Sequence, residues 1–150
     1  MEKAASSEER LRGLLSSQRL GVLATENDNQ PYTSLVAFAE SEDLGQLYFA
    51  TARSTRKYFN LKANPQAAML FDNRSNQVSD FSDATAATAI GLVDEVSADD
   101  REAALGIYLA KHPYLREFAS EPTCALMRLQ VSTYLLVNRF QNVVEIRLEP

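Results

Sequence analysis

ATARSTRKYFNLKANPQAAMLF, residues 50–71, holds the end of one strand, a short helix and a buried strand in direct succession. The spacing of Tyr58 and Leu61 predicts the helix. Asn64-Pro65 ends it, because a residue before proline avoids the α-helical region of backbone angles. QAAMLFD, residues 66–72, then has the apolar content of a buried strand. The stretch therefore predicts a strand–helix–strand unit in the middle of the chain.

Strands also dominate the rest of the pattern. Short alternating or apolar runs separated by turn residues indicate antiparallel hairpins, because a parallel return needs a crossover of a dozen or more residues. The pattern predicts strands at 19–25, 31–40, 45–51, 85–96, 124–140 and 142–148, helices at 7–17 and 97–112, a further helical turn at 113–119, and an exposed loop at 73–84. Gly91 suggests a bulge or bend in its strand. Such a chain favours a small, mainly β barrel with a few helices, since closure removes exposed sheet edges.

Composition limits the classes of protein that this chain could be. Its 150 residues, 45% hydrophobic and 23% charged, suit one folded domain over residues 1–150. We find no signal-peptide core and no run of about 20 apolar residues that could span a membrane, so we expect a cytoplasmic protein with no membrane partner. A net charge of −5 disfavours nucleic acid as a partner.

Several catalytic and cofactor motifs are absent from the sequence. The five glycines form neither a Rossmann fingerprint nor a phosphate-binding P-loop. With His112 as the single histidine, a multi-histidine metal site is excluded and a Ser-His-Asp hydrolase is disfavoured. The lone Cys124 excludes an intramolecular disulfide and a cysteine-based zinc site. We therefore predict no metal, and we expect His112 to be exposed or to cap a helix.

Three cations, Arg53, Arg56 and Lys57, gather at the start of the predicted central helix. A helix N-terminus has unpaired N–H groups and about half a positive charge, so cations there repel the helix dipole. A bound phosphate would make them favourable, and Ser54 and Thr55 would add hydroxyl donors. The cluster alone indicates either a phosphate site or a solvated helix face.

The order of four segments resembles that of a known family. QPYTSLVAF on one strand, LYFAT on the next, STRK opening a helix and NLKANPQAAMLF leading to a fourth strand follow one another. This arrangement resembles the pyridoxamine 5′-phosphate oxidase-like family of split β-barrels that bind flavin mononucleotide (FMN). The resemblance is good over residues 8–97, and residues 54–65 are its most specific part. It implies a mainly β fold, a six- to seven-stranded antiparallel split β-barrel with α-helices.

The resemblance also implies a cofactor, a partner and a set of site residues. In that family FMN lies in a groove between two protomers, so a homodimer with FMN as its cofactor is expected. Carried onto this sequence, the phosphate ligands are Arg56 and Lys57, with Ser54 and Thr55 as hydroxyl donors. The other implied contacts are Ser34, Leu35 and Val36 through their backbone, Ala50 and Thr51 to the ribityl chain or ring, and Asn73 and Arg74 at the start of a loop that reaches the cofactor. Arg53 has no matching role and is expected to be solvated.

Departures from the family pattern concern the substrate. True pyridoxamine-phosphate oxidases carry an arginine where this chain has Ser34, a lysine where it has Ala39, and an arginine where it has His112. Recognition of a substrate phosphate needs fixed cations. The sequence therefore predicts a flavoprotein that is not a true pyridoxamine-phosphate oxidase.

Two classes of function remain open at this point. The first is an FMN-dependent oxidoreductase of unknown substrate, whose catalytic residues cannot be assigned because the flavin carries the hydride chemistry. The second is a non-catalytic FMN-binding module that carries electrons or senses flavin. A haem-binding split barrel is less favoured, because His112 is the only conventional imidazole ligand.

Overall fold

The computed structural model describes residues 2–138 and 142–148, with side chains from Ser7 onward. Its helices are α1 (Glu2–Ser17), α2 (Arg56–Ala63), α3 (Asp80–Asp83), α4 (Ala98–Lys111), the 3-10 turn η1 (Pro113–Leu115) and α5 (Arg116–Ser120). Its strands are β1 (Leu20–Asn27), β2 (Gln30–Ala37), β3 (Ala39–Glu40), β4 (Gln46–Ala52), β5 (Gln66–Asp72), β6 (Ala86–Glu95), β7 (Cys124–Asn138) and β8 (Asn142–Arg147). None of the described helices is both long and apolar enough to cross a membrane.

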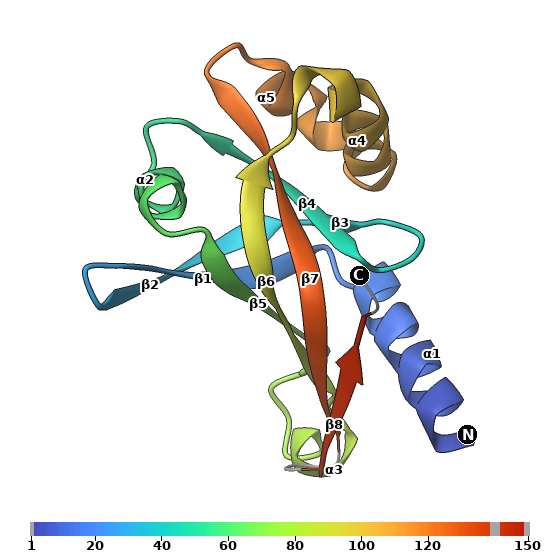
Figure 1. The fold of residues 1–150 in the computed structure, drawn as a ribbon. Coiled ribbons are helices and arrows are strands. Elements are labelled where there is room, and N and C mark those ends of the chain that lie inside the picture. Colours follow the sequence, from blue (N-terminus) through green and yellow to red (C-terminus); the bar gives the residue numbers. More distant parts are fainter. Residues whose placement is uncertain (1, 139–141, 149–150) are drawn as a thin grey trace.

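The strands form one antiparallel sheet that curls into a half-barrel (Figure 1). Its order is β2-β1-β5-β6-β7-β4-β3, and β8 adds to β7 beside this path. The long β7 pairs with β6 along one edge, while β4 and β8 share its other edge. The predicted mainly β, antiparallel split barrel with α-helices is thus confirmed.

Most predicted elements lie where the pattern placed them, with three differences. The first helix begins earlier, at Glu2, and the strand predicted at 31–40 is divided into β2 and β3. The loop predicted at 73–84 contains the short helix α3. There the Asp80 carboxylate accepts the backbone N–H groups of Ser75 (2.9 Å) and Asn76 (2.7 Å), which fixes the turn. The end of the strand predicted at 124–140 lies outside the described residues.

Gly91 lies at a β-bulge, as the sequence predicted. The pairing of β6 with β7 shifts register between Ile90 and Gly91. A Cβ atom at Gly91 would lie 1.9 Å from the carbonyl oxygen of Gln130, so only glycine fits this close approach.

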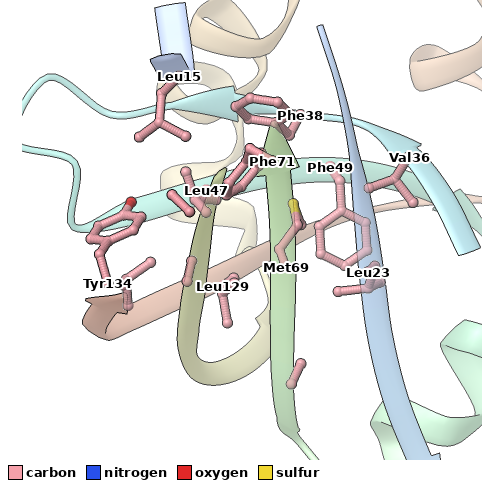
Figure 2. Close-up of a cluster of buried hydrophobic side chains, with 14 of the residues drawn as sticks. Leu15, Leu23, Val36, Phe38, Leu47, Phe49, Met69, Phe71, Leu129 and Tyr134 are labelled. Carbon is pink, nitrogen blue, oxygen red and sulfur yellow. The ribbon is translucent and has the colours of Figure 1, made fainter. Parts of the chain in front are cut away.

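Two hydrophobic clusters hold the sheet and helices together. The larger one fills the concave side of the half-barrel and includes Leu23, Phe49 and Met69 (Figure 2). The second packs Tyr108 and Leu109 of α4 against β4 and the first half of β7 on the other side of the sheet. Because side chains alternate along a strand, β4 serves both clusters. Helices α4 and α5 therefore cover one part of the convex face.

Candidate functional site

The start of α2 is built by Thr55, which is the N-cap of the helix. Its Oγ1 accepts the backbone N–H of Tyr58 at 3.3 Å, and it lies 2.7 Å from the hydroxyl oxygen of Thr51. Thr51 is fully buried and also donates to the carbonyl of Ala52. Both threonine hydroxyls are thus engaged in shaping the turn between β4 and α2, whereas Ser54 is exposed.

Arg56 and Lys57 occupy the first turn of α2, which contains no acidic residue. The Arg56 guanidinium carbon lies 5.7 Å from the centroid of the Tyr32 ring. Lys57 is partly buried, and burial lowers the pKa of its ammonium group. Within the described part of the chain, neither side chain has a carboxylate partner. A half-buried cation without a counter-charge is unfavourable unless an anion joins it.

Arg53 has a different role from its two neighbours. Its Nη2 donates to Glu95 Oε2 at 2.6 Å, and its Nη1 donates to the carbonyl of Pro122 at 2.9 Å. The other carboxylate oxygen of Glu95 accepts the hydroxyl of Tyr58 at 3.0 Å. The expectation that Arg53 is merely solvated is wrong, because β6 brings Glu95 beside it. The network ties α2 to the sheet and takes Arg53 out of the set of free cations.

The three predicted residues of β2 divide between the two faces of the sheet. Val36 is buried in the concave core, while Leu35 points to the convex face and is 66% exposed. Ser34 pairs with Leu23 and so points to the concave side. Its Oγ is buried and has no hydrogen-bond partner among the residues that the structure describes. A buried hydroxyl without a partner costs free energy, so it marks a place where a ligand group would be stabilising.

Ala50 is buried in the cluster beneath α4 and α5. The side chains of Ala50 and Thr51 are therefore both committed to packing, which leaves their backbone as the means of contacting a ligand.

Asn73 and Arg74 lie far from α2 of the same chain. They follow β5, which begins just after α2 and runs for about 20 Å. The loop beside α3 therefore lies at the far end of β5 from α2 (Figure 1). Asn73 Oδ1 accepts the N–H of Thr85 at 2.7 Å, and Arg74 pairs with Asp72 at 2.8 Å. A single chain therefore does not bring these two residues to the cation pair.

A hollow of about 320 Å³ lies between α2 and the β1–β2 hairpin, and the sequence reasoning missed it. Its lining residues are Asn27, Gln30, Pro31, Tyr32, Arg56 and Asn60. One sequence feature could have predicted part of this hollow: Arg56 and Asn60 are four residues apart, so both lie on one face of the helix. A larger hollow of about 580 Å³ between Pro113 and Pro122 contains no predicted site residue.

The single histidine is also placed by the fold. The sequence predicted that His112 is exposed or caps a helix. It is the C-cap of α4, and it is buried rather than exposed. Its Nε2 lies 2.6 Å from the carbonyl oxygen of Phe38, because α4 packs on the strand that follows β2.

Known structures share the fold of this chain. A haem-binding protein from Mycobacterium smegmatis superposes with a TM-score of 0.84 at 18% identity, over 94% of this chain and 57% of its own. General stress protein 26 from Bacillus anthracis superposes with a TM-score of 0.73 at 20% identity, over 94% and 98% of the two chains. An FAD-binding protein from Mesorhizobium loti superposes with a TM-score of 0.69 at 16% identity, over 85% and 91%. The chain thus spans little more than half of the mycobacterial protein.

No curated protein matches the sequence. The family model described as pyridoxamine 5′-phosphate oxidase matches residues 7–138, which include strands β1 to β7 and helix α2. Because this match extends over most of the chain, the protein belongs to the pyridoxamine 5′-phosphate oxidase family.

Proposed function

We propose that this protein binds FMN at the start of α2 and acts as an oxidoreductase on a small molecule. The observation that carries the proposal is the pair Arg56 and Lys57, which begins a helix and lacks a carboxylate partner among the described residues. The family membership and the flavin-binding relative of the same fold support it.

The residues present fit a phosphate monoester. In the first turn of α2, the backbone N–H groups of Arg56 and Lys57 have no acceptor within the helix. The two side chains would neutralise the phosphate charge, and the exposed hydroxyl of Ser54 would add a donor. The buried hydroxyl of Ser34 offers a further unused hydrogen bond on β2.

FMN, when bound, would supply hydride and electron transfer. The chain's own contribution would be to hold the phosphate and to orient the ring against β2 and β4. The competing proposal is a non-catalytic FMN carrier or sensor. Anaerobic reduction of the bound flavin with NADH and NADPH, followed by a screen of acceptors, separates the two.

We propose that a second copy of this chain covers the convex face of the sheet. Cross-strand partners point to the same side, so one row crosses five strands through Leu35, Val22, Leu70, Thr88 and Leu135. Leu35 is 66% exposed and the nearby Leu92 is 54% exposed. Helices α4 and α5 cover only the part of this face at β4 and β7. A sheet face that exposes several large apolar side chains is typical of an interface between protein chains.

Haem is a second candidate ligand, since the mycobacterial relative of the same fold is described as haem-binding. Axial ligation by His112, the only histidine, would require the loss of its buried contact with Phe38. The cation pair on α2 favours a flavin phosphate instead. Parallel titrations with haem and FMN decide between them.

The test of the flavin site is a titration of purified protein with FMN, followed by flavin fluorescence. Arg56→Ala should weaken binding about tenfold or more, because a hydrogen bond to a charged group is lost. Lys62→Ala is the matched control, since Lys62 lies on the same helix with its ammonium over the Tyr58 ring. No quenching by wild-type protein would refute flavin binding, and equal losses in both variants would refute the phosphate assignment.

A further inference from the structure

The hollow beside Arg56 has a lining suited to a nucleobase. Three of its six lining residues, Asn27, Gln30 and Asn60, carry carboxamides, and none is acidic. Carboxamides both donate and accept, which allows them to pair with the amino group and ring nitrogens of adenine. The Asn60 amide nitrogen donates to Thr25 Oγ1 at 3.0 Å, and no described residue donates to its oxygen. Asn60 is 4% exposed and lines the hollow, and its oxygen is an unused acceptor among the described residues.

Tyr32 adds an aromatic surface to the same hollow. Its ring is partly exposed, at 39%, and the Arg56 guanidinium lies over it. Bases stack on aromatic rings and on guanidinium planes, so this pair suits a flat heterocycle. Arg56 belongs both to the first turn of α2 and to the wall of the hollow. The hollow therefore adjoins the proposed phosphate site at Arg56.

The walls of the hollow are fixed before any ligand arrives. Asn60 joins α2 to Thr25 on β1, and Asn64 Nδ2 donates to Glu26 Oε1 at 3.0 Å. The other oxygen of Glu26 accepts the N–H of Asn29 at 3.0 Å, in the turn of the hairpin. These bonds hold helix and hairpin at a set distance. Its volume of about 320 Å³ is at the lower end of the range for small-molecule sites.

From this geometry we propose that the hollow binds the adenosine part of flavin adenine dinucleotide (FAD), with the adjoining pyrophosphate held at Arg56 and Lys57. The inference rests on the proposed flavin site and specifies its ligand: FAD binds more tightly than FMN, because only FAD fills the hollow.

The experiment is a pair of titrations, with FAD and with FMN, on wild-type protein and on variants of the hollow. FAD should bind about tenfold more tightly than FMN, as expected for one stacked and hydrogen-bonded base. Tyr32→Leu should remove most of this advantage while leaving FMN affinity within about twofold, and Tyr32→Phe should keep it. Gln30→Ala, at the exposed hairpin tip, should reduce the advantage without affecting the fold.

The outcomes distinguish the inference from the function on which it rests. If FMN binds and FAD binds no better, the adenosine site is refuted and the FMN site stands. If Tyr32→Leu weakens both flavins equally, Tyr32 acts through Arg56 and the adenosine site is again refuted. If neither flavin binds, both proposals fail. Circular dichroism of each variant shows whether it is folded.

Discussion

Arg53, in the turn between β4 and α2, donates to Glu95 of β6 at 2.6 Å, and the two residues are 42 positions apart in the chain. This pair leaves Arg56 and Lys57 as the cations of the cluster that lack a carboxylate partner among the described residues. The contact therefore separates a structural cation from two candidate ligands within one short segment.

The Glu95 contacts predict a dependence of stability on pH. Burial acts to raise the pKa of Glu95, but hydrogen bonds from Arg53 and Tyr58 outweigh it and hold the pKa below the ordinary 4.5. A carboxyl whose pKa falls on folding stabilises the protein above its unfolded pKa and loses that effect as the pH falls through its folded pKa. Glu95→Gln should therefore lower the melting temperature at pH 7 and differ less from wild type near pH 3. An equal difference in melting temperature between Glu95→Gln and wild type at both pH values would contradict this account.

Lys57 is expected to favour FMN binding while lowering the stability of the ligand-free protein. Burial lowers its pKa, so the charged form is penalised in the folded state at neutral pH. Stability should rise with pH between the folded and unfolded pKa values of this group, because the unfolded chain then binds more protons. Lys57→Met should leave the ligand-free protein as stable as wild type or more stable, while FMN affinity falls about 10- to 100-fold.

Urea unfolding with and without FMN measures both effects. FMN should raise the free energy of unfolding of Lys57→Met by less than it raises that of the wild-type protein. A variant that is less stable without ligand and equally stabilised by FMN would show that Lys57 is a structural residue.

Gly91 predicts a strong and local sensitivity to substitution. In Gly91→Ala the new Cβ would meet the Gln130 carbonyl at 1.9 Å, so the bulge must shift. We expect a loss of about 2–3 kcal/mol in the free energy of unfolding. Gly106→Ala is the control, because a Cβ there meets nothing within 4 Å on α4. It should gain about 0.5–1 kcal/mol from helix propensity. Equal effects in the two variants would argue against the bulge geometry.

The convex face predicts the oligomeric state. Sedimentation should show a dimer of the wild-type chain, and Leu35→Asp should shift it towards monomer, because a charge would be buried in the proposed interface at the β2 end of this row. Tyr114→Asp is the control, since Tyr114 is 86% exposed on η1, away from that row. A wild-type monomer that binds flavin tightly would rule out a dimeric site.

Local patterns in the sequence were enough to predict most of the helices and strands and the cation cluster. Asn64-Pro65 ends α2 because of backbone sterics between neighbours, and Gly91 marks a bulge because no side chain fits there. Arg56 and Lys57 are adjacent in the sequence, so their proximity does not depend on the fold. The family resemblance then supplied the split barrel, which the structure confirms.

Tertiary structure decided which of these residues are free. Arg53 is neutralised by a carboxylate 42 residues away, and Asn60 is bound to Thr25 35 residues away. The hollow exists only because the β1–β2 hairpin and α2 are joined by such contacts. Long-range pairing brings these residues together, and no spacing pattern within a short window encodes it. The sequence thus determined where the cations gather, whereas the fold determined which of them lack a carboxylate partner among the described residues and what lies beside them.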